Sequence, residues 1–475
     1  MRKTKIICTI GPKTRNLEII KELIKNGVDV VRINMAHDVK EQNGKFDFSE
    51  HSKTIDFVRR ASEELGKIVG ILQDISGLKV RIGEIKGKKL ELKRGDRIVI
   101  VNKNIEGEKG KDNKFYLTLN FKQIIGKLKP NQKLLVDDGR LTLEVISVSS
   151  DKVECEVLTS HILWEKKGIN IPYFSSELPV LTERDEASLL FGIKENVDMI
   201  AISFVRNAKD ILNVREFLKK NNTDKPIIAK IEKKESIENL DEIVKVADGV
   251  MVARGDLGIE IELENLPIYQ EKIIQTARRY RKPVIMATQM LYSMIKNDTP
   301  TRAEVCDIGN AIKQDCDALM LSDETAGIEA KYPVKAVEWM AKIIEKNETG
   351  YISTISGTSP EFTSFDTIIS YGLSHIASKG GIIKGLICEE EEIIPKIVAS
   401  FRTTCPILVF SKNLEILRPL TFIKGIIPIK IEKNISEKKG FLRKLGFDID
   451  NDIFIKVGRD RERKSNFYIQ IKRGI

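Results

Sequence analysis

The chain has 475 residues, of which 41% are hydrophobic, and it carries a formal net charge of +10. This length exceeds what one ordinary hydrophobic core needs and predicts roughly three domains, while no apolar run approaches the roughly 18 residues of a membrane-spanning helix. Lys and Arg are interleaved with nearly as many acids, so the charge indicates solvated helix faces and attraction to anionic metabolites, and it disfavours a nucleic-acid partner.

Short β-branched apolar runs recur through the first 325 residues, each followed by an amphipathic stretch typical of a helix. Eight such runs are predicted strands, at 5–9, 28–33, 68–72, 197–202, 226–231, 249–252, 283–287 and 318–321. Eight β/α units are the number that closes a (β/α)8 TIM barrel, whose chemistry lies at the carboxyl ends of the strands. A doubly wound open sheet is the competing arrangement.

Polar side chains follow every one of these predicted strands. A single polar residue at a strand end ordinarily caps the next helix, but charged or hydroxyl residues at all eight ends favour a barrel with a functional rim. These residues are Thr9, Arg32, Asn34, Asp74, Ser203, Arg206, Lys230, Glu232, Arg254, Asp256, Thr288, Gln289, Ser322 and Glu324.

Two segments depart from the alternation of predicted strands and helices, one within the barrel sequence and one after it. At 77–177 the residues alternate between apolar and polar and contain turn pairs such as Asp138-Gly139, which predicts an inserted β-rich, β-barrel-like domain. A stretch rich in Ser, Thr, Gly and Pro at 349–364 predicts a linker.

Beyond the linker, five apolar runs predict a smaller α/β domain, at 383–387, 407–410, 426–431, 453–457 and 467–471. The predicted domains are therefore a barrel in two parts, an insertion and a carboxyl-terminal domain, at 1–76, 178–348, 77–177 and 349–475.

The residues that most strongly indicate a catalytic site lie at the end of the fifth predicted barrel strand. Residues i and i+2 of a strand point to the same face, so Lys230 and Glu232 are both expected to face the barrel mouth. A structural salt bridge by itself explains such a pair. The next strand, however, brings Asp256 to the same rim behind Gly255. Two carboxylates on adjacent strand ends suit Mg²⁺ or Mn²⁺, with Lys230 left to neutralise a phosphate.

Three segments, AKIEKKES at 229–236, ARGDLG at 253–258 and ATQML at 287–291, resemble signature stretches of pyruvate kinase and occur in that family's order. The stretches VVRIN at 30–34 and LMLSDETA at 319–326 are similar to other parts of the family. Ordered agreement over some 340 residues is far more specific than a lone motif, although the carboxyl-terminal domain matches more weakly.

The resemblance implies a cytoplasmic glycolytic phosphotransferase that forms ATP and pyruvate from phosphoenolpyruvate and ADP, and a homotetramer. It also implies residue roles. Arg32 and Lys230 are expected to hold the transferred phosphoryl group, with Lys230 stabilising the transition state, and Glu232 and Asp256 are expected to hold the divalent metal.

The remaining expected roles concern the substrate carboxylate, the proton and the nucleotide. Backbone N–H groups at Gly255 and Asp256 are expected to bind the substrate carboxylate, and Thr288 to contact the substrate and belong to the route that protonates the enolate. The nucleotide-side residues that the resemblance implies are Asn34, His37, Arg81 and Lys167.

Potassium-dependent pyruvate kinases hold a cation beside the substrate phosphate, and this chain departs from their pattern. Asn34 and Asp74 remain, but Ala36 replaces a Ser, Ile75 replaces a Thr, and Lys79 stands where those members carry Glu. A fixed ammonium at Lys79 would supply the charge of the ion, so we expect K⁺ not to be required. The alternative is that Lys79 points to solvent.

The loop after the first strand of the carboxyl-terminal domain differs from that of sugar-phosphate-activated members. It carries four acids at 389–392, which would repel a phosphate. We therefore expect no activation by sugar phosphates.

Two other function classes compete with this interpretation. Aldolases and other phosphoenolpyruvate enzymes place metal-binding carboxylates at barrel strand ends without an ADP side, and a basic barrel could serve as a binding protein for RNA. The six cysteines form no Cys-x-x-Cys pair and no regular framework, which disfavours zinc and disulfides and predicts free thiols in a cytoplasmic protein without membrane association.

Overall fold

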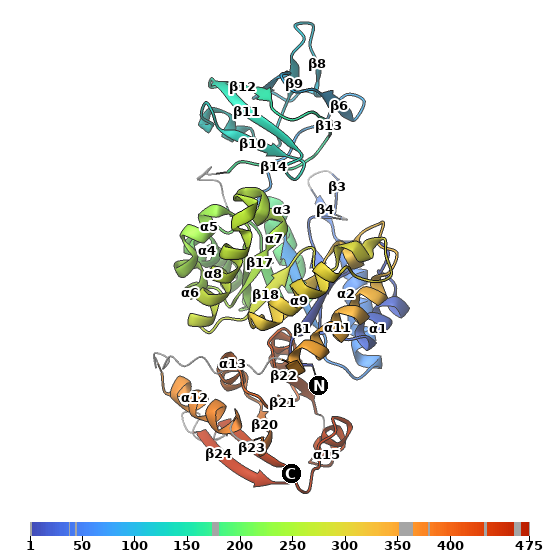
Figure 1. Cartoon of the computed structure of the whole chain (residues 1–475), viewed down its shortest axis with the longest axis vertical. Coiled ribbons are helices and arrows are strands. Elements are labelled where there is room, and N and C mark those ends of the chain that lie inside the picture. Colours follow the sequence, from blue (N-terminus) through green and yellow to red (C-terminus); the bar gives the residue numbers. More distant parts are fainter. Residues whose placement is uncertain are drawn as a thin grey trace.

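The computed structural model describes residues 2–37, 39–42, 45–172, 180–350, 364–378, 381–431, 435–459 and 467–474. A barrel occupies the middle of the molecule's long axis, with a β-rich domain at one end and an α/β domain at the other (Figure 1). None of the helices in these ranges is long and apolar enough to span a membrane.

The barrel is closed by eight parallel strands, which confirms the predicted (β/α)8 fold and makes the open-sheet alternative wrong. Their spatial order is β1-β19-β18-β17-β16-β15-β5-β2. Each strand is buried on both faces, which explains why these segments are apolar throughout rather than alternating. The bounds are Lys5–Thr9 for β1, Val30–Asn34 for β2, Gly70–Ile75 for β5, Met199–Ile202 for β15, Ile227–Ile231 for β16, Gly249–Ala253 for β17, Val284–Ala287 for β18 and Ala318–Leu321 for β19.

Amphipathic helices surround the barrel, and local capping explains where several of them begin. The side chains of Thr182 and Thr301 each accept a hydrogen bond from the backbone N–H three residues on, and the carboxylates of Asp185 and Glu304 accept one from the backbone N–H of the capping threonine. The helices are α1 Leu17–Lys25, α2 Ser49–Glu64, α3 Glu183–Lys194, α4 Ala208–Lys220, α5 Lys234–Glu238, α6 Leu240–Val246, α7 Arg254–Glu260, α8 Leu266–Arg279, α9 Arg302–Lys313, α10 Asp323–Ala326 and α11 Pro333–Gly350, with a short hairpin of β3 Lys40–Gln42 and β4 Lys45–Asp47 before α2.

The inserted domain consists of a seven-stranded sheet in the order β14-β10-β11-β12-β7-β9-β8 and a two-stranded ribbon of β13 and β6. It has its own apolar core, to which Ile98, Leu143 and Cys155 belong. Its strands are β6 Lys89–Leu92, β7 Arg97–Val101, β8 Glu108–Lys109, β9 Phe115–Leu117, β10 Lys133–Val136, β11 Leu141–Val148, β12 Lys152–Val157, β13 His161–Trp164 and β14 Ile169–Asn170. The predicted boundary at 177 lies outside the described residues.

The carboxyl-terminal domain contains all five predicted strands in the order β22-β21-β20-β23-β24, with only β24 antiparallel to its neighbour. Its elements are α12 Phe365–Ser378, β20 Ile383–Glu389, α13 Ile393–Ser400, β21 Ile407–Ser411, α14 Leu414–Leu417, β22 Ile426–Lys430, α15 Ile435–Lys444, β23 Ile453–Arg459 and β24 Phe467–Arg473.

The predicted linker begins too early in the sequence. Thr349 and Gly350 still belong to α11, where the Thr349 hydroxyl donates to the Lys346 carbonyl at 2.8 Å, and 351–363 lie outside the described residues. A Ser/Thr/Gly composition predicted non-helical chain there, but tertiary packing of a long helix overrides such a weak local preference.

The carboxyl-terminal domain packs against the amino ends of the barrel strands. One apolar cluster runs from Ile7 and Met251 inside the barrel to Leu386 and Ile407 in the domain's own sheet. The Nζ of Lys5 in β1 also donates to the carbonyl of Ile426 in β22 at 2.6 Å. The opposite, carboxyl ends of the strands are thereby left open toward the inserted domain (Figure 1).

Candidate active site

A cleft of about 1200 Å³ lies between the carboxyl ends of the barrel strands and the inserted domain. Its barrel wall carries most of the predicted rim, namely Arg32, Asn34, Ser203, Lys230, Glu232, Arg254, Asp256, Thr288, Gln289, Ser322 and Glu324. The inserted domain supplies the facing wall, including Arg81, Asn120, Asp138, Arg140 and Lys166. Predicted rim residues from six of the eight strand ends therefore line one concave site. Thr9 and Asp74, at the other two ends, contact Arg32 instead, and Arg206 pairs with Asp210 at 2.9 Å.

A buried carboxylate holds two cations together at the base of this cleft. Asp74 at the end of β5 accepts from Arg32 Nε at 2.7 Å and contacts Lys230 Nζ at 3.2 Å. A second hydrogen bond, from Arg32 Nη1 to the Thr9 hydroxyl at 3.1 Å, fixes the guanidinium. Burial tends to raise the pKa of Asp74, but the charges of Lys230 and Arg32 outweigh it and lower the pKa, so the carboxylate stays ionised.

Side-chain oxygens of three residues surround the ammonium group of Lys230. Its Nζ is 2.7 Å from the Ser203 hydroxyl and 2.9 Å from Glu232 Oε1, in addition to its contact with Asp74. Burial opposes the charged ammonium, but the carboxylates of Asp74 and Glu232 prevail and raise the pKa of Lys230. The side chain is therefore a fixed positive charge that faces the cleft.

Glu232 and Asp256 form a pair of carboxylates on adjacent strand ends. Glu232 Oε2 accepts from the Phe204 N–H at 2.7 Å, which orients the group. Burial raises the pKa of Glu232; Lys230 opposes this shift, and the charge of Asp256 adds to it. Two carboxylates on adjacent strand ends fit a hard divalent cation, which would relieve their mutual repulsion.

No group of three or more His, Cys, Asp and Glu side chains that could hold a metal ion occurs among the residues that the structure describes. Two protein carboxylates suit Mg²⁺, which usually keeps several waters and takes further oxygens from a bound substrate. Glu232 and Asp256 therefore fit the metal-ligand roles expected from the sequence.

A strained turn follows β18 at the rim of the cleft. Thr288 and Gln289 have φ values of +68° and +56°, a left-handed conformation that costs free energy and is common at functional sites. The Thr288 hydroxyl accepts from the Gly255 N–H at 2.8 Å and donates to the Ala287 carbonyl at 2.7 Å. The expected anion-binding N–H of Gly255 is therefore bonded to Thr288 here, which places the two predicted residues in direct contact.

Arg254 supports that turn, a role that the sequence did not indicate. Its Nη2 donates to the Thr288 carbonyl at 2.7 Å, and its Nη1 pairs with both oxygens of Asp307 at 2.9 and 2.7 Å. The sequence marks Arg254 as a polar strand end, but Asp307 lies within α9 and belongs to no motif.

Lys79 points into the cleft, so the solvent-facing alternative is wrong. Its Nζ lies 3.0 Å from Asp256 Oδ1 and 5.7 Å from the centre of the Phe204 ring, and its side chain is 22% exposed. The ammonium group of Lys79 therefore lies next to the carboxylates of Asp256 and Glu232.

The structure brings three of the four expected nucleotide-side residues to the cleft. Asn34, His37 and Arg81 line it, but Lys167 does not, because its Nζ pairs with Asp137 Oδ1 at 2.7 Å within the inserted domain. Its neighbour Lys166 lines the cleft instead. Lys166 has a φ of +62°, and this turn decides which of two adjacent lysines faces the barrel. A pair of consecutive lysines gives no sequence signal for that choice.

Comparisons with known proteins agree with this geometry. Residues 1–337 match the family model described as pyruvate kinase, barrel domain. Among curated relatives, the pyruvate kinase of Thermococcus litoralis is 38% identical over 467 residues, which cover 96% of this chain and 95% of that protein. The pyruvate kinase of Clostridium perfringens is 37% identical over 437 residues, with coverage of 90% and 89%.

A solved structure gives the same result at the level of the whole fold. The crystal structure of a pyruvate kinase from Cryptosporidium parvum has a TM-score of 0.88 and is 30% identical, covering 100% of this chain and 96% of that chain.

Proposed function

Because the chain belongs to the pyruvate kinase family, and is thus a phosphotransferase of glycolysis that acts on phosphoenolpyruvate and ADP, we propose that the cleft described above is its active site. The observation that carries this assignment is the cluster in which Asp74 holds Arg32 and Lys230 side by side, next to the carboxylates of Glu232 and Asp256. Neither the aldolase-like nor the RNA-binding alternative accounts for this family membership.

Phosphoryl transfer asks a protein mainly for positioning and for positive charge around the spreading charge of the transition state. We assign this work to Arg32 and Lys230, whose charges are fixed by Asp74 and which line the cleft. Because Lys230 is held by Ser203 and Glu232 as well, little reorganisation is needed when the phosphoryl group moves.

The family uses a divalent metal, and we assign it to Glu232 and Asp256, with Mg²⁺ or Mn²⁺ as the expected ion. When bound, such an ion supplies Lewis-acid stabilisation of phosphoryl oxygens. The Phe204 N–H keeps Glu232 oriented toward it.

The remaining assignments concern the proton and the nucleotide. Thr288, held against Gly255 by a 2.8 Å hydrogen bond, is assigned to substrate contact and to the route by which the enolate of pyruvate is protonated. Asn34, His37 and Arg81 are assigned to the nucleotide, with Lys166 in the place expected for Lys167. The insertion at 77–177 forms the facing wall, and its closure over the barrel would exclude water.

A coupled assay tests the assignment. Purified protein with Mg²⁺, ADP and phosphoenolpyruvate should yield pyruvate, and Lys230→Met should lower kcat by roughly 100- to 1000-fold, as loss of one transition-state charge donor does. The matched control is Lys219→Met, which alters an exposed lysine on α4 and should leave kcat unchanged. Equal pyruvate formation by wild type and Lys230→Met would disprove the assigned role.

We propose further that the enzyme works without K⁺, since the Lys79 ammonium lies 3.0 Å from Asp256 and brings a positive charge to the site. Turnover in potassium-free tetramethylammonium buffer should match that in potassium within about twofold, a difference well under 1 kcal/mol. Lys79→Glu should lower activity sharply in either buffer, because Ala36 offers no hydroxyl to complete a potassium site. Stimulation of the wild type by potassium of about tenfold or more would contradict the proposal.

The expected loss of sugar-phosphate activation is supported by the contacts of the acidic loop. Glu389 pairs with Lys438 at 2.6 Å and with Lys456 at 3.1 Å, so both nearby lysines already have a carboxylate partner, and three further acids follow at 390–392. Fructose 1,6-bisphosphate should therefore leave the phosphoenolpyruvate saturation curve unchanged. A shift of that curve to lower substrate concentration would show that a phosphate binds there after all.

Oligomeric state and location complete the proposal. We propose a homotetramer, and exposed apolar residues on α12 and β24, including Phe365, Ile368, Ile469 and Ile471, offer surface for one of its interfaces. A cytoplasmic location is supported by the six cysteines, all of them unpaired and five buried. Light scattering of the purified protein would test the tetramer directly.

A further inference from the structure

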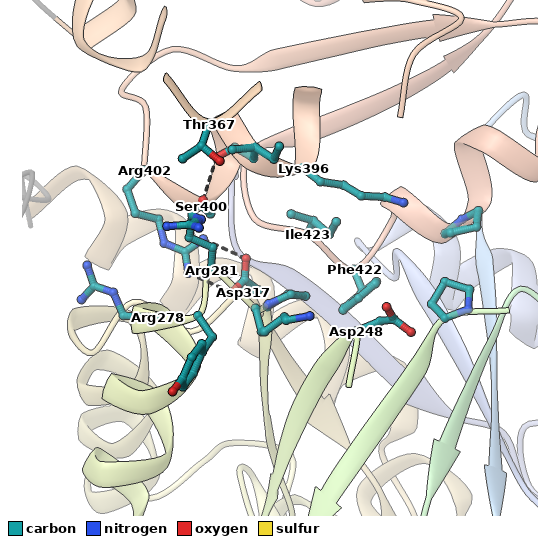
Figure 2. Close-up of a pocket in the computed structure, with 16 residues that line it drawn as sticks. Asp248, Arg278, Arg281, Asp317, Thr367, Lys396, Ser400, Arg402, Phe422 and Ile423 are labelled. Atoms are coloured by element: carbon teal, nitrogen blue, oxygen red, sulfur yellow. Dashed lines mark hydrogen bonds and ion pairs between the residues drawn. The ribbon is translucent and has the colours of Figure 1, made fainter. Parts of the chain in front are cut away.

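A second cavity, of about 310 Å³, is lined by residues of the barrel and of the carboxyl-terminal domain (Figure 2). It lies at the other end of the barrel from the catalytic cleft. Asp248, Pro283 and Asp317 in its wall immediately precede the strands β17, β18 and β19, so this is the amino end of the barrel. The carboxyl-terminal domain supplies the facing wall, with Lys396 and Ser400 of α13 among its residues. The cavity is thus built jointly by two domains.

Five basic and two acidic side chains line the cavity, and both acids are already neutralised. Asp317 forms two hydrogen bonds of 2.8 Å with Arg402, and its Oδ2 also accepts from the Val284 N–H at 3.0 Å. Asp248 Oδ2 lies 2.7 Å from Arg215 and accepts from the Ile227 N–H at 2.9 Å. Among the basic residues, Arg278 lies 3.5 Å from Asp315 and Lys396 lies 3.0 Å from Glu392, so the excess of positive charge in the cavity depends chiefly on Lys282.

Lys282 contributes most clearly to that excess. Within the described parts of the chain its ammonium has neither an ion-pair partner nor a hydrogen bond, although its side chain is only partly exposed. Burial lowers the pKa of Lys282, against the attraction of Asp248. A partly buried ammonium with three unused donors is a costly arrangement that an anionic ligand would relieve.

The other residues of the wall define the shape and chemistry of such a ligand. Arg281 and Lys396 also line the cavity, and Lys396 is 36% exposed and paired with Glu392 at 3.0 Å. Phe422 and Ile423 offer an apolar surface for a carbon skeleton. The volume is at the lower end of the range for small-molecule pockets, which is roughly 300–1000 Å³, and exceeds what a bare phosphate ion would fill.

We propose that this cavity is a second ligand site, separate from the catalytic cleft, that binds the phosphate group of a small phosphorylated metabolite, with Lys282 as its principal anchor. A doubly charged phosphate matches the clustered cations better than a single carboxylate does. Because the ligand would contact both domains, it would stabilise their docking and raise the midpoint of thermal unfolding by mass action.

Calorimetric titration of the full chain with glycerol 3-phosphate, and separately with inorganic phosphate, tests the site. Lys282→Gln should weaken binding by at least about tenfold, or about 1.4 kcal/mol, while Lys282→Arg, which keeps the charge, should retain it. Lys219→Gln removes the same charge from an exposed position on α4 and should bind like the wild type. Binding of the ester but not of inorganic phosphate would identify a metabolite site, and comparable binding of both a phosphate site; either supports the proposal.

Lys230→Met separates this cavity from the catalytic cleft and from the assigned function. Binding that survives Lys230→Met and is lost in Lys282→Gln supports the second site whether or not the enzyme is active. Binding that is lost in Lys230→Met and kept in Lys282→Gln would place the phosphate in the catalytic cleft and overturn the proposal. Absence of binding to the wild type, or equal binding to the wild type and Lys282→Gln, would also overturn it.

Discussion

Single residues in this protein include buried charges whose cost depends on pH, and Lys5 is the clearest case. It lies in β1, is 5% exposed, and donates to the carbonyl of Ile426 at 2.6 Å. Burial lowers the pKa of Lys5 to about 8, against the attraction of Asp29. The folded protein therefore releases this proton at lower pH than the unfolded chain does.

The sign of the resulting pH dependence follows from proton linkage. Between about pH 8 and the ordinary lysine value of 10.5 the unfolded chain binds more protons at this position, so the free energy of unfolding rises with pH. Below about pH 8 both states hold the proton and the burial penalty is fully present. The Lys5→Met variant has no titratable group at this position, so its free energy of unfolding lacks this contribution.

Chemical denaturation of the wild type and Lys5→Met at about pH 7.5 and 9.5 checks this prediction. The difference in the free energy of unfolding, wild type minus variant, should increase toward the higher pH by at most about 1.4 kcal/mol per pH unit. A difference that stays constant or decreases would show that the pKa of Lys5 is not lowered on folding.

At the scale of elements, two glycines differ in the space around them. One lies where another backbone segment comes too close for a side chain, and the other lies in a helix with open space beside it. A Cβ at Gly11, two residues after the end of β1, would lie 2.2 Å from the backbone oxygen of Ala326, the last residue of α10. A Cβ at Gly372, within α12, would meet no atom within 4 Å. The same added methyl group should therefore have opposite effects at the two positions.

Gly11→Ala should lower the free energy of unfolding by roughly 1–3 kcal/mol or more, because a backbone oxygen cannot move aside as a side chain does. Gly372→Ala should raise it by roughly 0.5–1 kcal/mol, since alanine loses less backbone entropy in a helix. Thermal unfolding of both variants beside the wild type measures the contrast. Equal shifts in the same direction would contradict it.

At the scale of the whole molecule, a buried ion pair joins the carboxyl-terminal domain to the barrel. Arg402 is 9% exposed and binds both oxygens of Asp317, while its Nη2 also donates to the Asp315 carbonyl at 2.8 Å. The attraction of Asp317 outweighs the effect of burial and raises the pKa of Arg402 above its ordinary value. Docking of the two domains therefore depends on the Arg402–Asp317 pair, and removal of either partner would leave a buried charge without a counterion.

Arg402→Met should destabilise the protein by roughly 3–5 kcal/mol, because it leaves the Asp317 charge buried without a counterion. Adding Asp317→Asn should recover part of that loss. The control Lys335→Met breaks a half-exposed pair with Asp298 and should cost no more than about 1 kcal/mol. If Arg402→Met costs no more than this control in thermal or chemical unfolding, the buried pair does not stabilise the docking of the two domains.

The sequence by itself determined the elements and the family. Buried strands need short β-branched runs, and this local requirement predicted all eight barrel strands and the five carboxyl-terminal ones. The two-residue period of a strand predicted that Lys230 and Glu232 share a face, and they are 2.9 Å apart. Ordered motifs predicted the pyruvate kinase family, which the comparisons confirm.

The tertiary structure alone decided which distant side chains meet. The contacts of Asp74 with Lys230 and of Lys79 with Asp256 join residues that lie 156 and 177 positions apart. The choice of Lys166 over Lys167 in the cleft depends on one turn of the inserted domain. Periodicity and residue preference act over a few residues, whereas these contacts depend on strand order, register and domain docking together, which no local pattern records.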